Sequence, residues 1–99
     1  RRKSIDRLAP WIVNVYFQNQ RLKPDGKTTL NTWCRGPASC DLIPIHATGG
    51  IDFDAVFEGL AAIQYRGPVT VHQAGTPGES TSESARATAD FLKRLCQKF

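Results

Sequence analysis

The sequence predicts an α/β fold in which parallel strands alternate with helices. A turn at Gly49 and Gly50 opens a capped amphipathic helix, a stop at Gly67 ends it, and an apolar run follows at once over residues 69–71. This order of turn, helix and strand is the unit from which parallel α/β barrels are built. Because such a unit needs neighbours to cover its apolar faces, we expect a single partial barrel domain over residues 1–99.

The first strand is expected over residues 10–18, where β-branched and aromatic residues follow a proline. Alternation gives this strand one apolar face and one face that becomes polar toward its carboxyl end, with Asn14, Tyr16 and Gln18. At the top of a barrel such a row can contact substrate hydroxyls. Residues 19–41 show no apolar periodicity, which predicts a long loop, and a short strand is expected over residues 42–46.

Two helices and one strand complete the predicted order. Asp52 is the expected N-cap of a helix over residues 52–65, whose apolar side chains recur at helical spacing. A strand over residues 68–73 follows. Ser80 and Glu83 form a capping box that starts a helix over residues 80–98. His46 and His72 each follow a predicted strand, at the end of a barrel where active sites lie, so both are candidate catalytic residues.

Composition excludes several classes of protein. The net charge is +4, but the basic residues gather at the two ends of the chain without interleaved aromatic residues, which disfavours nucleic-acid binding. No apolar run approaches the ~18 residues of a membrane-spanning helix, so we expect no membrane partner. Cys34, Cys40 and Cys96 favour free thiols in a reducing compartment and a cytoplasmic protein, with a disulfide between Cys34 and Cys40 as the alternative.

Three segments carry a resemblance to a known family. They are residues 13–19, the turn and helix of residues 49–57, and residues 64–71 with their Tyr-Arg-Gly-Pro-Val-Thr-Val run. In these segments the chain resembles the C-terminal portion of the sugar-phosphate isomerase/epimerase family, the xylose isomerase-like TIM barrels. The resemblance implies a carbohydrate substrate, and it implies the C-terminal part of a (β/α)8 barrel. Since the chain has no Met and opens on basic residues, we expect further residues upstream.

The resemblance also implies a divalent metal ion, because the family holds one with two carboxylates, a His and a closing Glu. In this chain the family's His falls at Tyr16 or Val15, and its closing Glu falls at His72. An imidazole can still bind a metal such as zinc, so His72 is the candidate metal ligand. Arg21 resembles an Arg that ends the equivalent segment in some ketose epimerases, and it joins the polar row as a candidate substrate-binding residue.

The predicted function is therefore part of a sugar or keto-acid isomerase or epimerase in which the usual metal ligands are substituted. One alternative is a catalytically inactive barrel fragment that self-associates or is completed by the remainder of a barrel. Another is an apurinic endonuclease-like barrel with a zinc cluster, although the His and carboxylate motifs of that group are absent from this segment.

Overall fold

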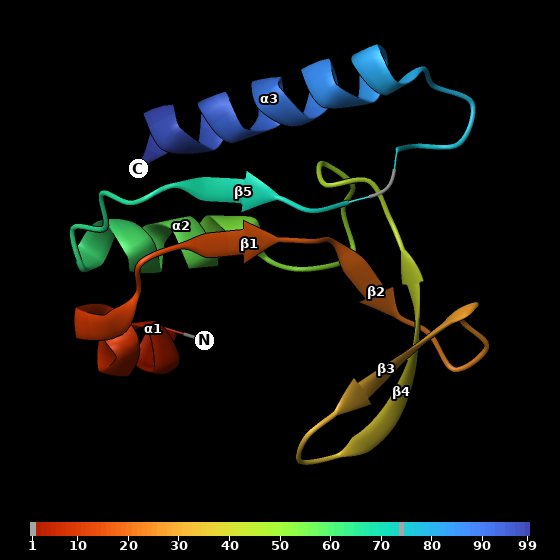
Figure 1. Ribbon diagram of the computed structural model, residues 1–99, viewed down its shortest axis with the longest axis horizontal. Helices are drawn as coiled ribbons and strands as arrows, with labels where there is room; N and C mark the ends of the chain where they lie inside the picture. The colour runs from red at the N-terminus through yellow and green to blue at the C-terminus, as the bar shows by residue number, and fades with distance from the viewer. Residues whose placement is uncertain (1, 74) are drawn as a thin grey trace.

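The computed structural model describes residues 2–73 and 75–99 as three α-helices, one short 3-10 helix and five strands (Figure 1). The elements follow the chain in this order: α1 (Arg2–Leu8), η1 (Ala9–Trp11), β1 (Val15–Phe17), β2 (Gln20–Leu22), β3 (Thr28–Thr32), β4 (Gly36–Leu42), α2 (Phe53–Ala62), β5 (Val69–Val71) and α3 (Thr81–Lys98).

The strands form two separate sheets. Strands β1 and β5 pair in parallel, with Val15 opposite Val69 and Phe17 opposite Val71. Strands β2, β4 and β3 form an antiparallel sheet in that spatial order. Figure 1 shows this second sheet as an arm that projects away from the helices and the β1–β5 ribbon.

The core lies between one face of the β1–β5 ribbon and the two longer helices. The Phe17 ring of β1 meets the Phe53 and Phe57 rings of α2, with centroids 5.2 and 5.3 Å apart. Phe53 in turn meets Phe91 of α3 edge-on at 5.9 Å. Leu95 of α3 joins this buried group. The apolar stripes of both helices and the apolar face of β1 therefore converge on one cluster, as amphipathic elements must.

Side-chain caps start both long helices where the sequence predicts them. Asp52 Oδ1 accepts a hydrogen bond from the Ala55 N–H at 3.0 Å. At α3 the Glu83 N–H donates to the Ser80 hydroxyl at 3.1 Å, and the Ser80 N–H donates to the Glu83 carboxylate at 3.2 Å. The capping box is thus confirmed, and it satisfies backbone donors that have no partner within the helix.

Asn19 is the fully buried polar side chain that joins the two halves of the fold. Its amide group donates to the carbonyls of Pro44, Ile45 and Ala47 at 2.9 to 3.2 Å, and its Oδ1 accepts from the Ile51 N–H at 3.0 Å. The segment between β4 and α2 has no regular secondary structure, so its peptide groups need partners elsewhere. One side chain therefore supplies the hydrogen bonds that this segment cannot make by itself.

The backbone of Asn19 extends the same network toward β5. Its N–H donates to the Gln73 side-chain oxygen at 2.9 Å, and its carbonyl accepts from the Ile43 N–H at 3.2 Å. The Gln73 amide also donates to the Ile43 carbonyl. Gly50 packs directly on the Asn19 side chain, where a Cβ would also lie 2.8 Å from the Gln20 carbonyl oxygen. Residue 50 must therefore be glycine, because a side chain there would overlap the Asn19 side chain and the Gln20 carbonyl oxygen.

The fold class predicted from the sequence is wrong. The chain contains both helices and strands, but it is not a succession of parallel βα units, and it does not have the pattern of a TIM-barrel fragment. Within residues 2–73 and 75–99, β1 and β5 pair in parallel, while β2, β3 and β4 form an antiparallel sheet. The error arose in residues 19–41, which were expected to form a loop between parallel strands.

Several element boundaries also differ from expectation. The strand expected over residues 10–18 is reduced to β1, because residues 9–11 form a 3-10 helix that includes Pro10. Residues 19–41 hold β2, β3 and most of β4, and β4 ends at Leu42, so no separate strand covers residues 42–46. The strand expected over residues 68–73 is β5, and the helices expected over residues 52–65 and 80–98 are α2 and α3.

The antiparallel arm escaped detection because its half-buried face is formed mostly by small or polar side chains. Strand β3 alternates half-buried with exposed positions, but Leu30 is its one apolar residue, so the sequence shows no apolar period there. A turn over residues 33–35 joins it to β4, and Gly36 follows with φ +70°. A left-handed residue after a short turn is a common way to close a hairpin. Gly26 packs against the Cys40 backbone, where a Cβ has no room.

Replacing Asn19 with Ala should lower the free energy of unfolding by about 3 kcal/mol, because several buried peptide groups lose their partner. Urea denaturation followed by circular dichroism measures this change. Asn31→Ala is the matched control, since Asn31 is exposed on β3 and should cost less than about 0.5 kcal/mol. Equal stability of the two variants would contradict the role of Asn19.

Lowering the pH should destabilise the antiparallel arm, because it protonates the Asp41 carboxylate. The Lys27 N–H donates to this carboxylate at 3.1 Å and lowers its pKa, burial opposes the shift, and Lys23 at 3.6 Å and Arg21 reinforce it. Because folding lowers the pKa of Asp41, the ionised carboxylate stabilises the fold at pH values above its usual pKa of 3.8. This contribution to stability is lost as the pH falls through the lowered pKa. We expect the Lys27 amide resonance to follow this titration in the wild type and in Asp25→Asn. A titration that persists in Asp41→Asn would contradict the assignment.

Candidate functional site

The uncovered face of the β1–β5 ribbon carries polar side chains from both strands. The parallel register places Tyr16 beside Thr70. Successive residues of a strand point to opposite faces, so both side chains point away from the core that Phe17 enters. The exposed fractions agree with this geometry, because Tyr16 is 67 % exposed and Phe17 only 6 %.

The ladder continues one step beyond the assigned strands. The His72 N–H donates to the Phe17 carbonyl at 2.9 Å, which extends the parallel pairing. The same alternation then places Gln18 and His72 on the face of Tyr16 and Thr70. Asn14, one residue before β1, is exposed and has the same phase. The register thus gathers one catalytic candidate and three substrate-binding candidates on a single surface, which we call the polar face.

Four side chains from the two strands give the polar face its chemistry: the Tyr16 hydroxyl, the Gln18 amide, the Thr70 hydroxyl and the His72 imidazole. Within residues 2–73 and 75–99 none of the four makes a side-chain hydrogen bond to another part of the chain. They include both donors and acceptors, and they remain available to a ligand. Sequence reasoning missed Thr70, which only the pairing of β5 with β1 brings beside Tyr16.

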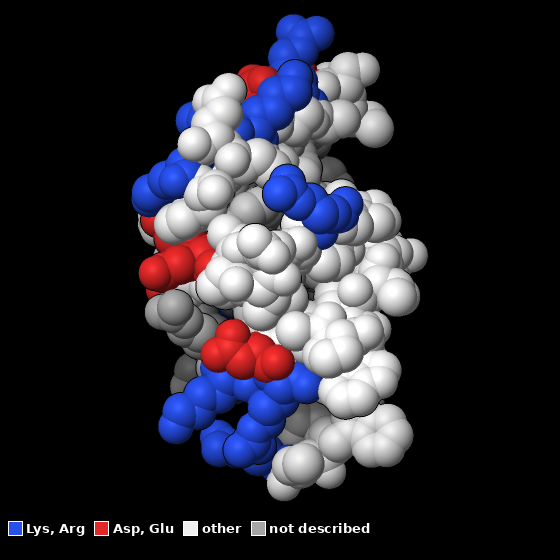
Figure 2. All heavy atoms as spheres, turned by 90° about the vertical axis from the view of Figure 1, so that its left-hand side faces the viewer, with Lys and Arg blue, Asp and Glu red and all other residues white. Residues whose placement is uncertain are grey.

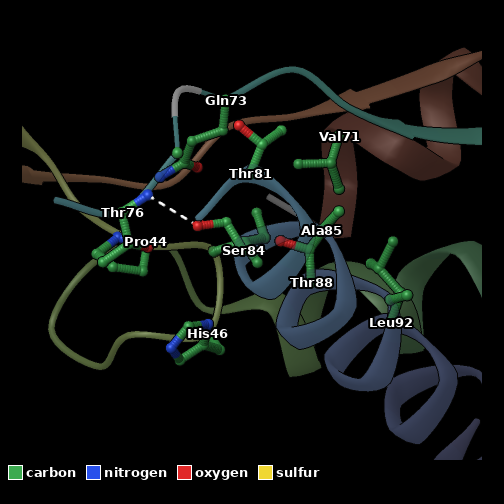
Figure 3. A pocket seen from close by; sticks show the side chains of 13 residues that line it. Pro44, His46, Val71, Gln73, Thr76, Thr81, Ser84, Ala85, Thr88 and Leu92 are labelled. Atoms are coloured by element: carbon green, nitrogen blue, oxygen red, sulfur yellow. Dashed lines mark hydrogen bonds between the residues drawn. The ribbon is translucent and has the colours of Figure 1, made fainter. Parts of the chain in front are cut away.

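His46 lies on the other side of the ribbon. It lines a pocket of about 350 Å³ between α3 and the segment that follows β4, together with Val71, Gln73 and Leu92 (Figure 3). Since Val71 and Gln73 both point into this pocket, the intervening His72 points away from it. The two candidate histidines therefore belong to different surfaces.

Two of the polar side chains around this pocket, Ser84 and Gln73, serve the fold itself. The Ser84 hydroxyl accepts from the Thr76 N–H and donates to the Glu79 carboxylate, both at 3.1 Å. Gln73 is held by Asn19 and Ile43. These bonds anchor the loop between β5 and α3, as the dashed line in Figure 3 marks for Thr76 and Ser84.

Arg21 lies on β2, beyond the carboxyl end of β1. Its partner in the antiparallel register is Asp41, and its side chain runs past the turn, where a Cβ on Gly49 would be 3.7 Å from Arg21 Cδ. Its substrate-binding role stays a prediction, since it sits on the antiparallel sheet rather than on the polar face.

The metal ion implied by the family resemblance needs several ligands close together. In the described parts of the chain no three His, Cys, Asp or Glu side chains are grouped so that they could hold a metal ion. His72 has Thr70 and Gln18 as its neighbours on the polar face. Because a catalytic zinc takes about three protein ligands, this donor set does not fit a metal centre.

Charge is distributed in patches of both signs. Figure 2 shows separate groups of Lys and Arg side chains on the end of the molecule formed by α1 and by the C-terminus of α3, with acidic side chains between them. Lys98 of α3 forms an ion pair with Asp54 of α2 at 2.7 Å. Throughout residues 2–73 and 75–99, no helix has the length and apolar character needed to cross a membrane.

Comparison of the chain with protein-family models, with curated proteins and with solved structures finds no match. The membership suggested by the family resemblance therefore stays a prediction, and any assignment of function rests on the geometry of the polar face.

Proposed function

We propose that the chain is part of a sugar or keto-acid isomerase or epimerase whose substrate lies on the polar face. The observation that supports this most directly is the register of β1 on β5, which gathers Tyr16, Gln18, Thr70 and His72 on one surface. Neutral hydroxyl and amide groups beside a flat aromatic ring are the usual partners of a polyhydroxylated ligand.

Isomerisation of such a substrate moves one proton between neighbouring carbons. The neutral His72 imidazole takes the proton from the carbon next to the carbonyl, and the electron pair of the C–H bond forms an enediolate. Gln18 and Tyr16 are hydrogen-bond donors that can stabilise its oxygen. The hydroxyl proton passes to the neighbouring oxygen, and the imidazolium returns the carbon-bound proton to the former carbonyl carbon, which completes an isomerisation without an oxidant. An epimerisation would need a second acid on the opposite side of the same carbon, because one imidazole reaches a single side.

Histidine suits this role because its imidazole gains and loses a proton near neutral pH. The proposal gives the role to His72 and not to His46, because only His72 shares a surface with the candidate substrate-binding residues. It uses no metal ion, since the described ligand set does not fit one.

A second candidate function is self-association without catalysis. Trp11 and Val13, which precede β1, are 72 % and 81 % exposed. Large exposed apolar side chains are a feature of contact sites. The ribbon has two strands, so each strand also has an unpaired outer edge.

We also propose a reducing compartment, such as the cytoplasm. All three cysteines are free: Cys34 and Cys96 are exposed, and Cys40 is buried. Exposed thiols persist in their reduced form where cellular reductants maintain them, which supports the proposal.

Titration with the ketose D-fructose and with hydroxypyruvate tests the proposed function. In a nitrogen–proton NMR spectrum we expect one of these compounds to shift the amide resonances of Tyr16, Thr70 and His72. His72→Ala and Tyr16→Ala should each weaken this binding by about tenfold, because each removes a ligand hydrogen bond. His46→Ala is the matched control and should bind as tightly as the wild type.

Zinc tests the metal role that the family resemblance gives to His72. Because the donor set around His72 does not fit a metal centre, we expect a calorimetric titration with zinc chloride to show no saturable binding that His72→Ala abolishes. Saturable binding that is lost in His72→Ala and kept in His46→Ala would contradict this expectation and restore His72 as a metal ligand.

A further inference from the structure

The pocket that His46 lines is bounded by three parts of the fold, and we call it the His46 pocket. Pro44 and His46 of the segment after β4 lie on one side of it, and Thr88 of α3 lies on the other side (Figure 3). Strand β5 contributes Val71, whose side chain points away from the polar face. The pocket volume of about 350 Å³ is within the range of ~300–1,000 Å³ that is usual for small-molecule sites.

The lining of the His46 pocket is mostly apolar and carries no permanently charged side chain. Its apolar side chains come from all three parts of the fold: Pro44, Ile45, Val71, Ala85, Ala89 and Leu92. Among the lining residues that the structure describes there is no Asp, Glu, Lys or Arg. A charged ligand would leave water here without meeting an opposite charge, which is costly. The lining therefore favours a neutral ligand with an apolar body.

Three polar side chains of the lining are available to such a ligand. They are the His46 imidazole and the hydroxyls of Thr81 and Thr88, and within residues 2–73 and 75–99 none of the three makes a side-chain hydrogen bond. A neutral imidazole has one donor and one acceptor, and a hydroxyl can both donate and accept. A single hydroxyl group on the ligand is therefore enough to pair with this side of the pocket.

We propose that the His46 pocket binds a small neutral aromatic alcohol, with its hydroxyl directed to His46. The wall formed by α3 is shallow, because Ala85 and Ala89 lie one turn apart and their side chains end at Cβ. A flat ring can lie between this wall and the imidazole, and aromatic rings attract one another when they stack with an offset or meet edge to face. A cavity of roughly 150 Å³ holds a benzene molecule, so the His46 pocket has room for a substituted ring.

This site goes beyond the proposed function, because the His46 pocket and the polar face lie on opposite sides of the β1–β5 ribbon. It gives His46 a binding role in which no bond is made or broken. It also accounts for a cavity that the hydrogen bonds of Ser84 and Gln73 border but do not fill.

Three compounds that share one ring and differ in charge test the proposal. In a nitrogen–proton NMR titration at neutral pH, benzyl alcohol should shift the amide resonances of His46, Val71 and Thr88 in a saturable way. Benzoate and benzylamine, which are charged at this pH, should bind at least about tenfold more weakly, because the lining has no opposite charge for them. The absence of a saturable shift at these residues would overturn the proposal, and so would equal or tighter binding of either charged compound.

Filling the pocket tests its location. Ala89→Phe places a ring in the space that the ligand would occupy, so it should weaken the binding of benzyl alcohol by at least about tenfold. Ala62→Phe, at an exposed position of α2 outside the pocket, is the matched control and should bind as the wild type does. Far-ultraviolet circular dichroism checks that each variant is folded.

Two milder variants keep the test decisive if Ala89→Phe does not fold. His46→Ala and Thr88→Val each remove a hydrogen-bonding group and should weaken the binding of benzyl alcohol by about threefold to tenfold. Wild-type affinity in both variants would overturn the proposed orientation of the ligand. Binding of D-fructose or hydroxypyruvate to the polar face should not change in any of these variants, so a failure here is distinct from a failure of the proposed function.

Discussion

The hydrogen bonds of Asn19 hold together the parts of this fold that regular secondary structure does not connect. Its side chain binds four peptide groups of residues 44–51, and its backbone binds Gln73 and Ile43. A buried amide is costly unless its hydrogen bonds are made, and here they are made with a segment whose own peptide groups would otherwise lack partners. The turn before α2 and the end of β5 are placed by this one residue.

That placement determines which residues meet on the polar face. Because the end of β1 is tied to Gln73, the chain remains paired one residue past β5, and His72 takes its place beside Gln18. The opposite face is filled by Phe17 and the helix side chains, apart from the pocket that Val71 and Gln73 help to line. The core and the candidate site are two consequences of the same strand alternation.

The antiparallel arm is physically separate from this core. Its strands pair with one another, Cys40 is buried on one of its faces, and the Lys27 N–H donates to Asp41 within it. An element that buries little apolar surface gains little stability from the packing of its own side chains.

Local patterns in the sequence were sufficient to predict α2 and α3, because helix caps and apolar stripes involve residues only three or four positions apart, as at Asp52 and Ser80. Within β1 they were also sufficient to separate Tyr16 from the buried Phe17, although Trp11 and Val13, which belonged to the same predicted apolar face, are exposed. They could not show that Thr70 stands beside Tyr16, that His46 and His72 face opposite ways, or that Asn19 is buried. Each of these depends on hydrogen bonds between residues 25 or more positions apart, as between Asn19 and Gln73, and such partners meet only in the folded chain.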